Sequence, residues 1–406
     1  MCLLFSAKSD SSSIIEQGFE PARPRRLDYV APVSNRRDRK PEALPLDPGV
    51  LRDGIVCEFQ SDLAVLAQGG TVVQPWRDRY LAAEAADLHV VSSARELPDE
   101  SFGQVLVHLQ KSRTATFSDL QHAWRILQPG GQLLFTGTNS LGVVSAVKRL
   151  ATQLEQTPIV VSNRARARVV RFKKDEGAGP DVEATPTFQA QVESIRNESF
   201  EFDIETLPGV FSAKKLDSGS QALIQALARF AGHKPPKRIV DLGCGTGVLG
   251  IAAATLWPEA EVLLVDGDRR AVECAQSNIE RLDLTSRCRV AWWDAREQPI
   301  DSRFDLALVN PPFHQRGMDI DFGPALALFD SLREWIRPGR RALIVANRKL
   351  PYEAPLEEIG ELEILKTAGG YKLLSLKRSA RSARSRGRNS PGSRSSGKFR
   401  APTRSR

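Results

Sequence analysis

Asn310-Pro311-Pro312-Phe313 combines the residue types that can hold a flat ring bearing an exocyclic amine. Such an amine is a poor nucleophile because its lone pair is delocalised into the ring. The side-chain oxygen of Asn310 and the carbonyl of Pro311 can accept its two N–H groups, and the prolines fix the turn before the ring arrives. Phe313 can stack on the ring, a contact worth about 1–3 kcal/mol in nucleic-acid complexes. The four residues therefore predict amine chemistry that needs no strong base; an ordinary Pro-Pro surface turn is the alternative.

A glycine-rich segment, Asp241-Leu-Gly-Cys-Gly-Thr-Gly247, lies upstream of this turn. It follows an apolar strand pattern and opens a helix pattern, a context in which glycines let the backbone approach a nucleotide-like ligand. Its order differs from the G-x-G-x-x-G of NAD-binding loops, and Asp241 can face the cationic amino group of a methionine moiety. The segment predicts S-adenosylmethionine as the cofactor, and the pair of motifs predicts methylation of an amine. The cofactor-binding residues predicted here are Asp241, Gly243, Cys244, Gly245 and Gly247, with Cys244 filling space in the loop rather than reacting.

Three further acids follow predicted strands. Asp266 ends the next strand after the glycine loop, where a carboxylate can accept hydrogen bonds from both ribose hydroxyls. Asp268 competes for that role but fits better as the cap of the following helix. Asp294 follows the third strand and is predicted to receive the adenine amine, with a turn or helix-cap acid as the alternative.

The second half of the chain alternates strand and helix patterns that position these residues. Buried apolar strands alternating with helices predict a parallel, doubly wound sheet. The expected strands are 238–242, 262–265, 289–292, 305–309, 342–345, 361–365 and 371–376, and the expected helices are 219–231, 248–256, 269–281 and 324–336.

The first half carries a similar but simpler pattern. Strands are expected at 88–91, 104–109 and 132–136 and a helix at 117–127, and the segment 123–135 resembles 333–345, a helix followed by Pro-Gly and a strand. We interpret this as a duplicated domain whose first copy lacks both motifs. The predicted organisation is a leader (1–48), a degenerate methyltransferase-like domain (49–190) that ends in a polar linker from 173, a catalytic domain (191–377) and an Arg-rich tail (378–406).

Charge is concentrated in the tail. It carries nine Arg, one Lys and no acid, whereas the whole chain has a net charge of +8, so the remainder is slightly acidic. The leader is rich in Ser, Pro and Arg and is predicted to be flexible and disordered. The tail has almost no apolar residues to bury and is also predicted to be disordered; its arginines fit RNA phosphates, with a solubilising role as the alternative. Five scattered cysteines without a CxxC pair, no apolar run long enough to span a membrane and no signal-peptide pattern predict a cytoplasmic protein.

These motifs resemble the class I S-adenosylmethionine-dependent methyltransferases. More narrowly, residues 50–377 resemble the bacterial ribosomal RNA guanine-N2 methyltransferases, with Leu207–Ser212, Leu216–Ser220, Asp241–Gly247 and Asn310–His314 as the most specific pieces. The resemblance implies two tandem Rossmann-like domains, of which the C-terminal one is active. It also implies that Phe211, Gly219 and Ser220 border the cofactor pocket with Asn310, and that Asn310 to Phe313 take the guanine amine.

The leading hypothesis is methylation of a guanine N2 amine in ribosomal RNA by a monomeric enzyme, with the small-subunit RNA favoured over the large. An N6-adenine or glutamine-N5 methyltransferase is the first alternative, because Asn-Pro-Pro-aromatic motifs serve those amines too. A non-catalytic RNA-binding or ribosome assembly factor is the second.

Overall fold

The computed structural model describes residues 41–175, 179–181, 187–193, 199–210, 216–230, 235–311, 314–316, 319–321 and 323–380. Most of the expected disordered leader and tail lies outside these ranges. Within them, no helix is both long enough and apolar enough to cross a membrane.

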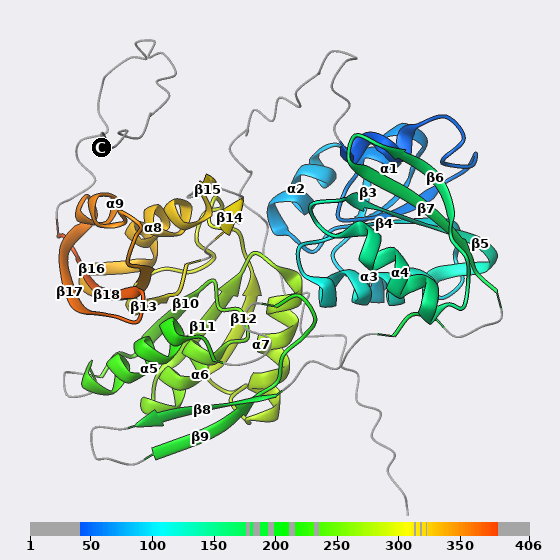
Figure 1. Ribbon diagram of the computed structural model, residues 1–406. Coiled ribbons are helices and arrows are strands. Elements are labelled where there is room, and N and C mark those ends of the chain that lie inside the picture. The colour runs from blue at the N-terminus through cyan, green and yellow to red at the C-terminus, as the bar shows by residue number, and fades with distance from the viewer. Residues whose placement is uncertain are drawn as a thin grey trace, which may run out of the picture.

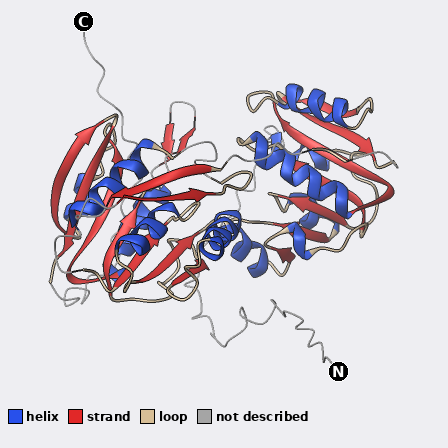
Figure 2. Cartoon of the chain, turned by 90° about the horizontal axis from the view of Figure 1, so that it is seen from below, coloured by secondary structure: helices blue, strands red, loops and turns tan. Residues whose placement is uncertain are grey.

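Two seven-stranded sheets form the body of the protein, each in the same order (Figures 1 and 2). The first sheet has the order β3-β2-β1-β4-β5-β7-β6 and the second β12-β11-β10-β13-β16-β18-β17. The first is made of β1 (Val56–Phe59), β2 (Gly70–Val73), β3 (His89–Val91), β4 (Phe102–His108), β5 (Leu127–Thr138), β6 (Ile159–Arg164) and β7 (Ala167–Lys173). The second is made of β10 (Arg238–Leu242), β11 (Glu261–Asp266), β12 (Cys288–Trp292), β13 (Phe304–Val309), β16 (Ile336–Asn347), β17 (Gly360–Ala368) and β18 (Tyr371–Arg378).

Helices pack against both sheets and complete the tandem Rossmann-like fold expected from the sequence. The helices of the first domain are α1 (Leu63–Gln68), α2 (Arg77–Ala85), α3 (Arg113–Ile126) and α4 (Val143–Gln153), with 3-10 turns η1 (Pro41–Leu46) and η2 (Ala94–Glu96). Those of the second are α5 (Ser218–Phe230), α6 (Val248–Leu256), α7 (Arg269–Arg281), α8 (Gly323–Trp335) and α9 (Glu353–Glu357). Two separate hairpins, β8 (Phe188–Glu193) with β9 (Ser199–Ile204) and β14 (His314–Arg316) with β15 (Asp319–Asp321), are added to this frame.

Three expectations need correction. The sheets are not wholly parallel, because β5 pairs antiparallel with β7 and β16 antiparallel with β18. Residues 41–46, assigned to the leader, form η1, whose Leu44 is fully buried in the core of the first domain and therefore ties this segment down. The linker expected up to residue 190 ends earlier, since Phe188 already starts β8 and is buried in the core of the second domain.

Strand register brings the chemical residues to one edge of the second sheet. In β10, Leu242 pairs with Val265 of β11 and with Val309 of β13, all running parallel. The next residues, Gly243, Asp266 and Asn310, therefore leave the sheet side by side at the carboxyl ends of the strands. Ligands bind at this edge in open α/β sheets, where the strand order reverses.

Candidate active site

The glycine loop between β10 and α6 adopts a backbone that favours glycine. Gly243, Gly245 and Gly247 have φ angles of 74°, 56° and 84°, in the left-handed region that side chains disfavour. A Cβ built on Gly245 meets no atom within 4 Å among the residues that the structure describes, so these residues leave space above the loop. Because that space lies at the carboxyl edge of the sheet, the loop is shaped to receive a ligand rather than to pack against protein.

Asp241 lies beneath this loop, fully buried at the end of β10. Its Oδ2 accepts a hydrogen bond of 2.8 Å from the backbone N–H of Gly250, but its Oδ1 is buried without a partner among the described residues. Burial raises the pKa of this carboxyl to about 7. A buried acceptor without a partner is energetically costly, so the position fits a cationic or N–H group supplied by a ligand.

Asp266 lies at the end of β11 and is partly buried. One carboxylate oxygen accepts from the N–H of Gly245 at 2.9 Å and the other from the N–H of Asp268 at 2.9 Å. Desolvation raises the pKa of Asp266 to about 6. A carboxylate has about four acceptor sites, so Asp266 retains acceptor capacity for a ligand hydroxyl group. Asp268 instead caps α7 by accepting from the N–H of Arg270, as the sequence indicated.

Asn310 follows β13 and has a defined orientation. Its Nδ2 donates to Ser220 Oγ at 2.9 Å and lies 3.4 Å from both carboxylate oxygens of Asp217. A carboxylate can only accept, so the amide nitrogen must face Asp217, which leaves Oδ1 pointing away as the acceptor. The side chain is therefore fixed as an acceptor, the role that the amine hypothesis assigns to it.

Asp217 was not singled out from the sequence. Its Oδ1 accepts hydrogen bonds of 3.0 Å from the N–H groups of Gly219 and Ser220 and so holds the first turn of α5. The signal that could have identified it is an acid immediately before Ser218-Gly219-Ser220, the pattern of a helix N-cap. One carboxylate thus fixes both the helix start and the Asn310 amide.

Asp294 is held by another partner. Its carboxylate pairs with Arg296 at 2.6 and 2.8 Å and accepts from the backbone N–H of the same residue, which is the turn geometry considered as its alternative role. The expected adenine contact stays a prediction. Cys244 is buried and its pKa is raised by burial, which keeps the thiol protonated, consistent with space filling.

Other residues of the expected site differ in how far the structure places them. Gly219 and Ser220 are buried at the start of α5, and Pro311 follows Asn310 as a buried residue. Phe211, Pro312 and Phe313 lie outside the described residues, so their expected roles stay predictions.

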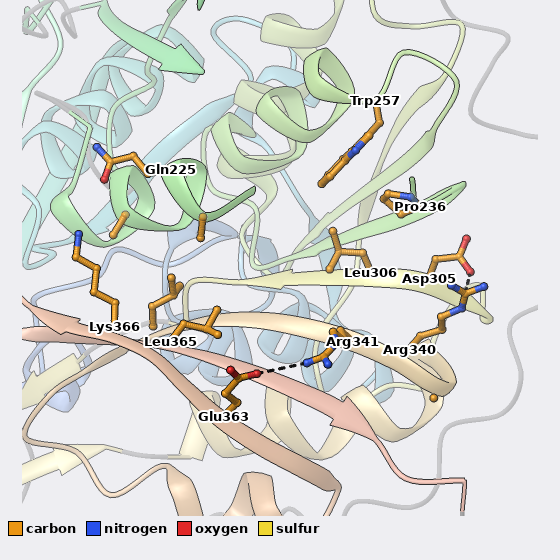
Figure 3. Close-up of a pocket in the computed structure, with 14 residues that line it drawn as sticks. Gln225, Pro236, Trp257, Asp305, Leu306, Arg340, Arg341, Glu363, Leu365 and Lys366 are labelled. Atoms are coloured by element: carbon orange, nitrogen blue, oxygen red, sulfur yellow. Dashed lines mark ion pairs between the residues drawn. The ribbon is translucent and has the colours of Figure 1, made fainter. Parts of the chain in front are cut away.

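A cavity of about 540 Å³ lies elsewhere in the same domain (Figure 3). It is lined by α5, the end of α6 and the strands around Asp305, Arg341 and Glu363. Asp305 is the second residue of β13, and Arg341 of β16 pairs with Leu306 next to it. Asn310 follows the other, carboxyl end of β13. The cavity is therefore separate from the candidate site, which lies at the carboxyl edge.

Comparison with known proteins places this geometry in context. A model of the methyltransferase small domain matches residues 201–375. The ribosomal RNA small subunit methyltransferase C of Pseudomonas aeruginosa is 30% identical over 286 residues, which cover 70% of this chain and 81% of that protein. The ribosomal RNA large subunit methyltransferase G of Magnetococcus marinus is 38% identical over 152 residues, 37% of this chain, and the chain spans only 40% of the length of that relative.

Among solved structures, a 16S rRNA N2 methyltransferase from T. Thermophilus in complex with AdoMet and guanosine is similar over both domains. The match has a TM-score of 0.71 and 26% sequence identity, and it covers 84% of this chain and 93% of that one. Similarity of this extent covers the first domain as well as the second, so the tandem arrangement is shared.

Proposed function

The chain belongs to the ribosomal RNA small subunit methyltransferase C family, and on that premise we propose that it methylates the exocyclic N2 amine of a guanine in 16S ribosomal RNA with S-adenosylmethionine. The observation that carries the proposal is the fixed orientation of Asn310, whose Oδ1 faces away from Asp217 and Ser220. An acceptor fixed in this way suits an amine that must be oriented before it can attack.

The residues around the glycine loop fit the cofactor. Asp241 Oδ1 is a buried acceptor that the amino group of the methionine moiety would satisfy, and Asp266 retains acceptor capacity for a ribose hydroxyl group. The described residues also leave the space above Gly245 open, where the ligand would lie. When bound, S-adenosylmethionine supplies an electrophilic methyl group on a sulfonium centre.

The chain's own residues orient the amine. Asn310 Oδ1 and the Pro311 carbonyl would accept the two N–H groups of the guanine amine, which turns its lone pair out of conjugation and toward the methyl group. As the nitrogen gains the methyl group it becomes acidic, and its proton passes to solvent without a strong base. Catalysis then rests on orientation and electrostatics, which a fixed amide can provide.

The product distinguishes this proposal from its alternatives. The full chain is incubated with labelled S-adenosylmethionine and with ribosomal subunits from a strain that lacks the gene, and the RNA is then digested to nucleosides. We expect label in N2-methylguanosine of 16S RNA. Label in N6-methyladenosine would support the adenine alternative, and label in protein would support the glutamine alternative. If no methyl group is transferred although the protein binds RNA, the result would support an assembly factor.

We further propose that the enzyme acts as a monomer in the cytoplasm, where ribosomal RNA is made, and that its Arg-rich tail contributes to RNA affinity. The tail was expected to start at residue 378, but Arg378 is the last residue of β18, so the segment to delete is 381–406. Every charged residue in that segment is basic. Each phosphate contact releases counterions, so deletion of the segment should weaken binding most at low salt and reduce the slope of log K against log salt. An unchanged slope would leave the segment as a solubilising tail. Sedimentation analysis tests the monomer.

A further inference from the structure

The loop that carries Asp266 is joined to the first domain by main-chain hydrogen bonds. The N–H of Arg77 donates to the carbonyl of Gly267 at 2.8 Å, and the N–H of Arg269 donates to the carbonyl of Pro75 at 2.8 Å. These two bonds form an antiparallel bridge between Trp76 and Asp268. The residue next to the expected ribose acid is therefore held by the other domain.

Side chains reinforce this bridge from the first domain. Arg77 donates to both carboxylate oxygens of Glu297 at 2.9 Å, and its guanidinium lies 5.1 Å from the ring centroid of Trp292. Tyr80 packs edge-on against the same tryptophan, with ring centroids 4.9 Å apart. The indole N–H of Trp292 in turn donates to the carbonyl of Gly267 at 3.1 Å, so these contacts converge on one peptide of the loop.

Arg270 of the second domain makes a further contact with the first domain. Its guanidinium pairs with Asp268 at 2.8 Å and donates to Gln110 Oε1 of the first domain at 3.1 Å. The side chains of Arg270 and Asp268 are only 17% and 7% exposed, so this pair is shielded from solvent. Asp268 donates its N–H to Asp266, which links the interdomain pair directly to the cofactor acid.

The bridge is also internally symmetric. In the first domain, Glu58 of β1 pairs with Val72 of β2. In the second, Asp241 of β10 pairs with Leu264 of β11 in the same way. Gln74 and Asp266, each two residues after these partners, therefore occupy equivalent positions. It follows that Pro75 and Trp76 correspond to Gly267 and Asp268, and Arg77 to Arg269. The equivalent loops of the two copies thus bind each other across a local twofold relation, as in an isologous dimer.

We propose that Arg77 and Arg270 are positioning residues that couple docking of the first domain to cofactor affinity, through the loop Asp266-Gly267-Asp268. The degenerate domain would then form a structural part of the cofactor site. The inference rests on the proposed function, because it assigns S-adenosylmethionine to Asp266.

A pair of substitutions at one position isolates the main-chain bridge. Arg77 is the first residue of α2, where proline is tolerated, and Trp76 before it has φ −86° and ψ 118°, which suits a residue preceding proline. Arg77→Ala removes only the side chain, whereas Arg77→Pro also removes the N–H that donates to Gly267. Arg95→Ala is the matched control, since it removes another interdomain ion pair, with Glu273 at 3.6 Å, away from the loop.

The readout is the Kd for S-adenosylmethionine by calorimetry, together with kcat and KM. One lost hydrogen bond of about 1 kcal/mol corresponds to an affinity about five-fold lower for Arg77→Pro than for Arg77→Ala. The KM for the cofactor should rise in parallel, while kcat at saturating cofactor and the KM for RNA stay near those of Arg77→Ala. Equal affinities for the two variants, or an equal loss for Arg95→Ala, would overturn the proposal.

Hydrogen exchange on the unmodified chain gives a second test that does not depend on a variant folding. Coupling between sites is reciprocal, so the cofactor should slow amide exchange at 76–78 of the first domain if docking favours the cofactor. If calorimetry shows that the protein binds the cofactor but amide exchange at 76–78 is unchanged, the coupling between the domains is contradicted and the proposed function is not. Failure of the unmodified chain to bind the cofactor would instead contradict the proposed function.

Discussion

The two domains share one strand order, yet they differ at the three strand ends where the candidate site lies. Register makes Glu58 of the first domain equivalent to Asp241 of the second, since each lies between the same pair of neighbouring strands. Two residues further along the adjacent strands, Gln74 corresponds to Asp266 and His108 to Asn310. The second copy thus has two acids and an amide at these three positions. The first copy has an acid, an amide and an imidazole at the equivalent positions.

The first copy uses its polar groups for its own stability. Glu58 is fully buried, accepts from the N–H groups of Ala64 and Val65, and pairs with His108 Nε2 at 2.8 Å. Both of its oxygens are therefore occupied, whereas Asp241 keeps one oxygen without a partner among the described residues. A buried acceptor without a hydrogen-bond partner lowers stability, and at this strand end the protein keeps such an acceptor only in the copy that is proposed to bind the ligand.

The loops above these acids differ in the same sense. Three residues separate β1 from α1, whereas five separate β10 from α6. Gln60 occupies the position equivalent to Gly243, and the two residues have similar positive φ angles of 70° and 74°. The side chain of Gln60 donates a hydrogen bond to Asp119, which also accepts one from Gln110. Side chains thus fill in the first copy the space that the second leaves open, so a shared topology does not by itself provide a site.

The largest effect is expected at Asn310, the residue that most separates the copies. Asn310→Ala removes a fixed acceptor, and loss of one preorganised hydrogen bond at a reacting centre costs on the order of 10²–10³-fold in kcat. Single-turnover methylation with saturating RNA measures this. The Kd for S-adenosylmethionine should persist; a parallel loss of cofactor binding would mean that Asn310 acts on the cofactor.

Glu58 should affect stability without affecting the site. Glu58→Ala leaves two buried amides and His108 without their acceptor, and breaking a buried pair of this kind costs about 3 kcal/mol of unfolding free energy. Urea unfolding measures the loss, with Glu58→Gln as the control because it keeps an acceptor oxygen. Cofactor affinity of the folded variant should be unchanged, and a large loss there would argue that the first copy still binds ligand.

The pH dependence of cofactor binding should follow the two acids of the second copy. Burial raises the pKa of Asp241 to about 7 and of Asp266 to about 6, and the cofactor's cation and hydroxyls favour the ionised forms. Affinity should therefore rise with pH through this window and then level off. Above about pH 7, Asp241→Asn should weaken cofactor binding about ten-fold. The variant should also lose the part of the pH dependence near pH 7, which comes from Asp241. A pH-independent Kd would place the ligand elsewhere.

Stability without cofactor should change with pH in the opposite direction. Both carboxyls have folded-state pKa values above their unfolded values, so the folded protein holds these protons more tightly. Their contribution to stability is fully present below the unfolded-state pKa of 3.8, is lost progressively as the pH rises, and is gone above about 6 to 7. Comparing the pH profile of Tm for the unmodified chain and Asp241→Asn isolates this contribution; identical profiles would contradict it.

The smallest effect is expected at Asp217, which acts through Asn310. Asp217→Ala removes the acceptor that fixes the amide and should lower kcat by about five-fold, the equivalent of one hydrogen bond of about 1 kcal/mol. Asp217→Asn keeps an oxygen that can hold both α5 and the Asn310 amide, so it should restore most of the rate. Equal rates for the two variants would show that Asp217 serves only as a helix cap.

Periodic segments and their caps could be read from the sequence. The limits expected for α6 and α7 match the structure, because Gly247 and Asp268 mark the starts of the helices and apolar spacing marks their faces. The hairpin β6–β7 was missed, since its edge strand has an exposed face at Ile159 and Val160 and so lacks a clear burial pattern. Strand direction was also missed, because local pattern does not encode whether β18 returns antiparallel.

Residue types at strand ends are the basis of the proposed site, but the pairwise geometry of these residues could not be predicted. Nothing local shows that Asp217 turns the Asn310 amide, since 93 residues separate them. The bond between Arg77 and Gly267 joins two domains, and its existence depends on how the copies dock. Sequence therefore identified which groups are present, and tertiary packing determines which of them is free to bind a ligand.

We propose that only the second copy holds a cofactor site, built on Asp241 and Asp266. Calorimetric titration of S-adenosylmethionine into the full chain and into Asp266→Ala tests it most directly. We expect one site per chain, with affinity at least about ten-fold lower in the variant because charge-assisted hydrogen bonds are lost. Two sites per chain, or one site unaffected by the substitution, would contradict it.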